Sequence, residues 1–237
     1  MAQPSLVQSA AAASSVNSPT TITPTLGSGS TQGNILLLVV AVTGTSPTVT
    51  TPANWTLIQS SVNSGISLYL FEIQNNLGGI TSVAVTVSAT NGGAVGALFE
   101  YAGDGVGLTG NIQTPEYTAA TSGAGTSLPD LFYLKRIVNA QELNFVAAAA
   151  FVATFSNTQT GEFGANLIPA NNQSSVATTN VRLECYQGFN PGPTTPTFAL
   201  GLSAGGGCAM VVARFGGTGP RLGSTDGSVY SGSYSVG

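Results

Sequence analysis

The chain has 237 residues, of which five are Lys or Arg, nine are Asp or Glu and none is His, giving a net charge of −4. Hydrophobic residues make up 42% of the chain, so it can form a core and is not typical of a disordered protein. Five scattered cations cannot neutralise the phosphates of a nucleic acid, so we expect no nucleic-acid partner. No apolar run reaches the roughly 20 residues of a membrane-spanning helix, so we expect no membrane partner either.

Residues 1–27 are rich in Ala, Ser, Thr and Pro and predict either an N-terminal arm or a first strand. Their beginning, MAQPSLVQSAAAASS, lacks the basic start and the apolar stretch of a secretory signal peptide. We therefore expect synthesis in the cytoplasm without export by that route.

Four segments between residues 28 and 103 predict strands: 33–42, 66–76, 82–89 and 96–103. The segment SVAVTVSA (82–89) alternates, with Val83, Val85 and Val87 on one side. Short alternating segments, frequent Gly and Pro turns and the absence of a helical period indicate an all-β protein.

The same order of segments recurs later in the chain, at 142–152, 181–190, 197–204 and 211–217. In TFALGLSA (197–204), Phe198, Leu200 and Leu202 keep the phase of the earlier valines, and a slip of one residue would have exchanged the two faces of the strand. This repetition predicts an internal duplication, and hence two tandem β-sandwich domains of jelly-roll or immunoglobulin-like type with extended termini.

The expected boundaries follow from the repeats. Copy one covers 28–103, a linker covers 104–121 and copy two covers 122–217. The segment 128–138 has no partner in copy one and predicts an extra strand or a short helix that is a candidate contact surface. Residues 218–237 form a Gly/Ser/Tyr-rich C-terminal arm, in which Tyr230 and Tyr234 are candidate assembly residues.

The residues that usually carry catalysis are scarce. Without histidine there is no Ser-His-Asp or Cys-His arrangement, and Cys185 and Cys208 cannot build a four-cysteine zinc site. The two cysteines form either one disulfide or two buried thiols. Glu72 and Glu100 lie near strand ends and are a conceivable carboxylate pair, although copy two has Arg214 where copy one has Glu100. We expect no enzymatic activity, no metal and no cofactor.

Trp55, the only tryptophan, lies in TPANWTLIQ (51–59). One interpretation is a core anchor that follows a Pro-containing turn, with Leu57 on the same strand face. The other is a sugar-stacking platform to which Tyr69, Tyr101 and Tyr186 would contribute. The sequence leaves both open.

Copy one, through GNILLLVVAV, TPANWTLIQS, SLYLFEIQ and GALFEYAG, resembles a module of bacteriophage structural proteins and some bacterial extracellular proteins. Copy two keeps the order of strands but lacks the tryptophan turn. The resemblance implies a β-sandwich in a virion: a non-enzymatic capsid decoration or cement protein, or a minor tail component. Its partners would be copies of itself and other virion proteins. The alternative is a receptor- or glycan-binding tail-fibre or adhesin module that binds a host surface glycan. A bacterial surface protein is the third interpretation, against which the missing signal peptide counts.

Overall fold

The computed structural model describes residues 5–16, 19–62, 65–74 and 76–102, and then the strands at 120–122, 131–132, 143–150, 155–156, 168–169, 176–178, 181–189, 197–198, 201–202 and 208–215. These residues are all-β, with no helix among them, and every strand pairing that they make is antiparallel. The expected all-β class is confirmed for this part of the chain.

The first half, which we define as residues 5–102, contributes two sheets. Its large sheet, called the first large sheet, has the strand order β1-β8-β3-β6-β5, and its small sheet has the order β2-β7-β4. The strands are β1 (Ser5–Val16), β2 (Thr20–Ile22), β3 (Ile35–Thr43), β4 (Thr45–Val49), β5 (Thr56–Val62), β6 (Ile66–Ile73), β7 (Val85–Thr90) and β8 (Gly92–Ala102). The N-terminal segment therefore provides a strand, β1, which pairs with β8 along its length.

The second half, residues 120–215, contributes a second large sheet of order β13-β15-β11-β18-β9, with β14 also paired to β15. Two short pairs, β10 with β16 and β12 with β17, complete it. The strands are β9 (Ala120–Ser122), β10 (Leu131–Phe132), β11 (Leu143–Ala150), β12 (Phe155–Ser156), β13 (Ile168–Pro169), β14 (Val176–Thr178), β15 (Val181–Phe189), β16 (Thr197–Phe198), β17 (Gly201–Leu202) and β18 (Cys208–Phe215). Strand β9 spans the expected boundary between linker and copy two, and β10 lies within the unmatched segment 128–138.

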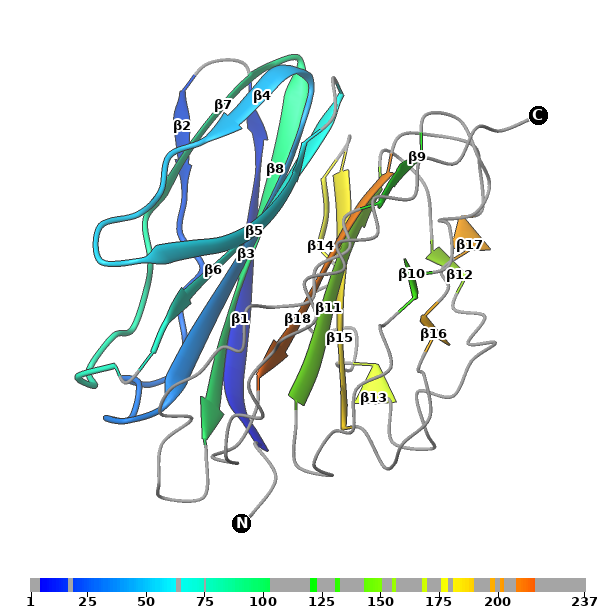
Figure 1. Cartoon of the computed structure of the whole chain (residues 1–237). Helices are drawn as coiled ribbons and strands as arrows, with labels where there is room; N and C mark the ends of the chain where they lie inside the picture. The colour runs from blue at the N-terminus through cyan, green and yellow to red at the C-terminus, as the bar shows by residue number, and fades with distance from the viewer. Residues whose placement is uncertain are drawn as a thin grey trace, which may run out of the picture.

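The sheets are stacked in layers (Figure 1). The small sheet lies on one face of the first large sheet, and the second large sheet lies on the opposite face. The short strands β10, β12, β16 and β17 lie on the far side of the second large sheet. The first large sheet is consequently covered on both faces.

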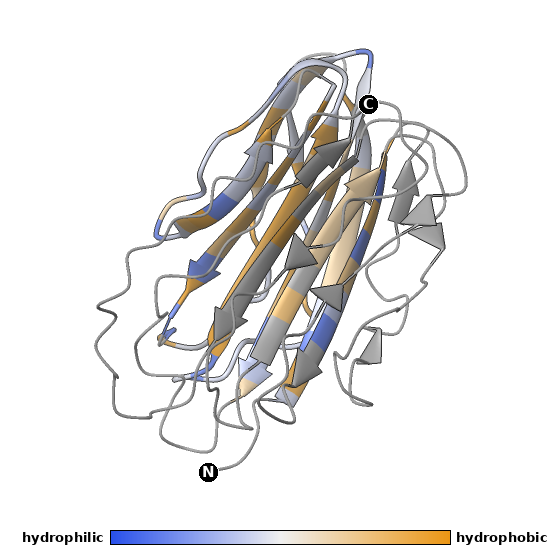
Figure 2. Ribbon diagram, turned by 45° about the vertical axis from the view of Figure 1, so that its right-hand side comes forward, coloured by the Kyte–Doolittle hydropathy of each residue, from blue (hydrophilic) through white to orange (hydrophobic). Residues whose placement is uncertain are grey.

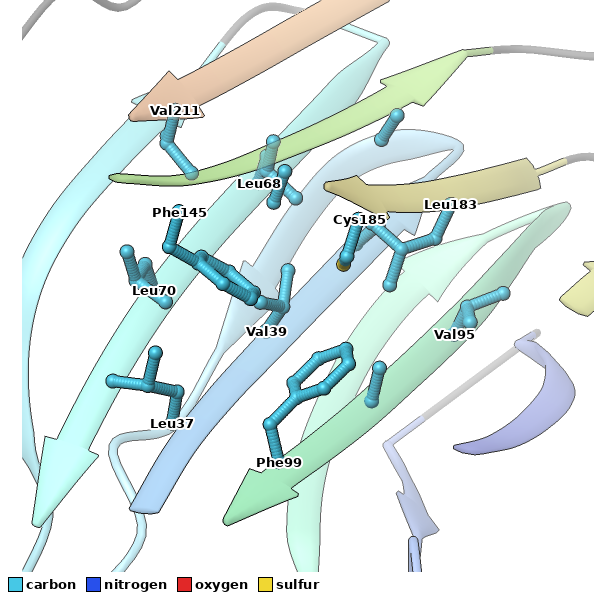
Figure 3. Close-up of a cluster of buried hydrophobic side chains, with 14 of the residues drawn as sticks. Leu37, Val39, Leu68, Leu70, Val95, Phe99, Phe145, Leu183, Cys185 and Val211 are labelled. Atoms are coloured by element: carbon cyan, nitrogen blue, oxygen red, sulfur yellow. The ribbon is translucent and has the colours of Figure 1, made fainter. Parts of the chain in front are cut away.

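Two hydrophobic clusters fill the layers on either side of the first large sheet. The outer core lies between this sheet and the small sheet, and includes Leu36, Leu38, Val85 and Val87. The inter-sheet core lies between the two large sheets, where Phe145, Leu183, Cys185 and Val211 face Leu37, Val39, Leu70 and Phe99 (Figure 3). Residues of both halves thus share the inter-sheet core, whereas the outer core consists of first-half residues alone.

Strand β3 shows why the central segments of the chain do not alternate. All nine of its residues are buried, because odd-numbered side chains from Ile35 to Ala41 enter the inter-sheet core and even-numbered ones from Leu36 to Val42 enter the outer core. A strand covered on both faces needs apolar side chains at every position. Figure 2 accordingly shows apolar residues running along the strands, with hydrophilic residues mainly at strand ends and turns.

Candidate functional site

Trp55 lies in the outer core, with 8% of its surface exposed. Its backbone N–H donates to the carbonyl of Pro52 at 3.2 Å, and Asn54 between them has a φ of 67°. Asn is one of the few residues that tolerates this left-handed conformation in a turn, so the sequence TPANW folds into a turn that directs the indole inwards. Leu57 does not accompany it: this side chain is 42% exposed.

The candidate tyrosines lie in different environments. Tyr101 has no exposed surface, and its hydroxyl donates to Gln187 Oε1 at 2.8 Å across the inter-sheet core. Burial, followed by the nearby Cys185 thiol, raises the pKa of Tyr101. Tyr69 is half-buried and stacks on Phe71 with 6.1 Å between ring centroids. A buried ring offers no face to a sugar, so of Trp55, Tyr69 and Tyr101 only Tyr69 is placed for such stacking. Tyr230 and Tyr234 lie outside the described residues.

Glu100 is the centre of a polar cluster at one end of the first large sheet. Its carboxylate is fully buried and accepts hydrogen bonds from Gln8 Nε2 at 2.5 Å, the Thr31 backbone N–H at 2.7 Å and Asn34 Nδ2 at 2.5 Å. Burial alone would raise the pKa of Glu100, but these hydrogen bonds outweigh it and lower the pKa. A buried, ionised and fully paired carboxylate ties the loop before β3 to strands β1 and β8.

Asn76 extends this cluster to the loop after β6. Its side-chain amide donates to the carbonyls of Thr31 at 2.9 Å and Asn34 at 2.8 Å, and its Oδ1 accepts from Ser30 Oγ at 3.0 Å. Each of these groups satisfies backbone or side-chain atoms of the same two loops. The chemistry of the Glu100 cluster is therefore that of a structural clamp.

Glu72 is in a different situation. It is 5% exposed, and its Oε1 accepts a hydrogen bond from Gln74 Nε2 at 3.1 Å, but its buried Oε2 accepts none among the described residues. Burial raises the pKa of Glu72 to about 7, and the bond from Gln74 offsets only part of this rise. The charge of Glu72 thus changes near neutral pH.

The two glutamates do not form a pair. Glu72 is the cross-strand neighbour of Leu37, which faces the inter-sheet core, and Glu100 is the neighbour of Leu36, which faces the outer core. Cross-strand neighbours share a face of the sheet, so the two carboxylates lie on opposite faces. They cannot flank one glycosidic bond, as a glycosidase pair must.

A further polar group lies on β15, on the face of the second large sheet opposite the inter-sheet core. Arg182 Nε donates to Glu184 Oε1 at 2.9 Å, and the Tyr186 hydroxyl donates to Glu184 Oε2. Burial, together with the bond to Glu184, raises the pKa of Tyr186, so its phenol stays protonated. The sequence pattern R-x-E-x-Y places the three side chains on one face of a strand.

The cysteines lie on strands that are not neighbours. Cys185 on β15 pairs in register with Ala147 of β11, while Cys208 on β18 pairs with Ala150 of the same strand. Strand β11 therefore separates them by two strand spacings, about 9–10 Å, and a disulfide needs Cα atoms within about 7 Å. The fold keeps the two cysteines of one chain apart.

Within the described part of the chain, no three residues of the types His, Cys, Asp and Glu gather where they would hold a metal ion. Nor does that part contain a helix with the length and apolar character needed to cross a membrane. Comparisons with protein families, curated proteins and solved structures found no match.

The pKa of Glu72 leads to a pH-dependent stability. Because the folded state raises this pKa from 4.5 to about 7, folding is favoured by protonation, and the contribution is full below about pH 4.5 and lost as the pH rises through 7. We expect stability in urea to fall between pH 5 and 8 by up to about 3 kcal/mol, less to the extent that solvent reaches the carboxylate. Glu72→Gln should remove this fall.

Glu100→Gln is the matched control for that prediction. The pKa of Glu100 is lowered on folding, so its charge stabilises the protein above the unfolded pKa and loses its effect in acid. Glu100→Gln should reduce stability throughout pH 5–8 without changing the slope. A slope that persists in Glu72→Gln would show that other groups cause it.

Proposed function

We propose that this protein is a non-enzymatic structural component of a virion, a capsid decoration or minor tail protein that acts through contacts between subunits. The resemblance of copy one to phage structural modules gives the class. The observation that carries the proposal is the absence of surface charge on the first half: residues 1–102 contain no Lys, Arg or Asp, and their two glutamates, Glu72 and Glu100, are both buried.

An uncharged surface favours contact between proteins over repulsion. Net charge keeps copies of a protein apart, whereas a surface without it promotes association. The exposed residues of the small sheet are instead mostly threonine and serine, as at Thr21, Thr48 and Thr86. Such a surface exchanges hydrogen bonds with water for hydrogen bonds with a neighbouring subunit at little electrostatic cost.

Strand β5 is the part of this surface best suited to a second copy of the chain. It is the outermost described strand on its side of the first large sheet, and it contains no charged residue and no proline. Leu57 and Val62 are 42% and 60% exposed on the face that they share with half-buried Tyr69. Natural edge strands usually carry a charge that prevents pairing, so an edge of this kind favours it.

In this proposal, the two halves of the chain are two β-sandwich repeats that together form the rigid body of the subunit. The strand order β5-β6-β3-β8-β1 of the first half is matched by β13-β15-β11-β18-β9 in the second, and β2-β7-β4 is matched by the pairs β10-β16 and β17-β12. This agreement of order supports the internal duplication. The C-terminal arm, 218–237, lies outside the described residues.

Val62→Lys tests the contact. A lysine on this edge should oppose pairing, shifting the oligomer towards monomer by at least tenfold in dissociation constant, as measured by analytical ultracentrifugation. The control is Thr86→Lys, an exposed position on β7, which already has strands on both sides. Wild-type assembly should also persist in about 1 M salt, where electrostatic screening acts over about 3 Å.

Three results would contradict these proposals. Equal assembly of Val62→Lys and wild type would exclude β5 as the contact, and dissociation by salt would show that charges hold the subunits together. Antibody labelling of purified particles tests the virion assignment itself, which fails if the chain is found only outside particles.

A further inference from the structure

The inter-sheet core repeats itself. Val39 at its centre is the cross-strand neighbour of Leu70 and Ala97, and Ala147 is in the same way the neighbour of Cys185 and Val211. Once Val39 is taken as equivalent to Ala147, the registers of the paired strands assign a second-half equivalent to each first-half residue of these strands. No alignment of side chains is needed.

Each second-half residue that the structure describes in this core has a first-half equivalent in the same core. The pairs of equivalent residues are Leu37 and Phe145, Val39 and Ala147, Ala41 and Ala149, Ile66 and Val181, Leu68 and Leu183, Leu70 and Cys185, Val95 and Ala209, and Ala97 and Val211. The two large sheets therefore bury equivalent faces against each other.

The contacts between strands of the two large sheets follow the same symmetry. Strand β6 lies against β18, and β8 lies against β15; β1 lies against β14, and β5 lies against β9. Strands β6 and β15 hold equivalent places, as do β8 and β18, and β1 and β9. Exchanging the halves thus turns each contact into another that is present, which is the property of an isologous, two-fold interface.

We infer that the two halves form a pseudo-homodimer within one chain: the inner face of each large sheet is a self-complementary docking surface whose fitting partner is a second copy of the same half. The inference rests on the proposed duplication and goes beyond the proposed virion role. The surface is mainly apolar and buried, as in obligate dimers, and it is distinct from the β5 edge that faces outwards.

The inferred symmetry offers a reason why Glu72 Oε2 has no donor among the described residues. Tyr101 donates to Gln187 across the layer, and the ladders make Gln187 equivalent to Glu72 and Tyr101 equivalent to Phe215. Exchanging the halves therefore makes position 215 the counterpart of Tyr101 and Glu72 the counterpart of Gln187. Phenylalanine has no hydroxyl to donate, and Glu72 Oε2 is buried without a donor among the described residues.

Phe215→Tyr tests this arrangement in the full chain. Its hydroxyl should donate to Glu72, raising the folding equilibrium constant about tenfold at pH 8 and lowering the pKa of Glu72, which is read by carboxyl ¹³C NMR. Combining Phe215→Tyr with Glu72→Gln places a tyrosine and a glutamine at the positions equivalent to Tyr101 and Gln187. The two substitutions should therefore be coupled in a double-mutant cycle. Phe99→Tyr, whose equivalent position is Ala213, is the control and should be destabilising and uncoupled to Glu72→Gln.

The inference is overturned if Phe215→Tyr neither couples to Glu72→Gln nor changes the pKa of Glu72. The NMR titration decides the matter even if Phe215→Tyr is destabilised, because the pKa depends only on whether a donor reaches the carboxylate. Both measurements concern the folded monomer, so their failure would leave the proposed assembly through β5 untouched, and failure of assembly would leave the pseudo-homodimer untouched.

Discussion

Phe145→Ala is expected to destabilise the whole chain by about 3–5 kcal/mol and to lower the unfolding transition of the first half as well as the second. Phe145 belongs to the second half, but its ring is fully buried against first-half rings, with centroids 5.2 Å from Phe99 and 6.3 Å from Tyr101. Removing it leaves a cavity in the layer that both large sheets share.

The single tryptophan makes this measurable. Trp55 lies in the outer core, on the side of the first large sheet away from Phe145, so its fluorescence reports on the first half alone. Urea unfolding followed by this signal and by circular dichroism should give one coincident transition, shifted in Phe145→Ala. The control is Phe145→Leu, which copies the residue at the equivalent position, Leu37, and should cost less than about 1.5 kcal/mol. A Trp55 transition unaffected by Phe145→Ala would mean two independent domains.

The positions of the central strands β3, β6 and β8 were predictable from sequence, but the layering of the sheets was not. The alternating apolar residues over 82–89 correctly predicted a strand with one buried face, β7. One face of this strand meets solvent and the other meets the outer core. The run ILLLVVAV also contained a signal for burial on both faces, since no polar residue interrupts it. It could not say what covers the second face, because this depends on the other half of the chain.

The polar clusters were harder to predict for a related reason. Glu100 interrupts an apolar strand, which marks it as unusual, but its partners Gln8, Thr31 and Asn34 are 66 to 92 residues away in sequence. Hydrogen bonds over such separations are set by the register of strands. Trp55 and Leu57 illustrate the same limit: i and i+2 share a face only within a regular strand, and β5 begins at Thr56 and carries a bulge after Leu57.

Trp55→Ala is expected to reduce stability by about 3–5 kcal/mol, because a nearly buried indole leaves a cavity in the outer core. Trp55→Phe keeps an aromatic ring and part of the volume, and it should cost clearly less. Circular dichroism follows both variants, which lack the fluorescent reporter. The two substitutions also separate the core interpretation from sugar stacking, since phenylalanine still offers a ring face to a sugar. Loss of binding to host cells or glycans by Trp55→Ala, at unchanged stability, would make Trp55 a ligand platform and would contradict its place in the core.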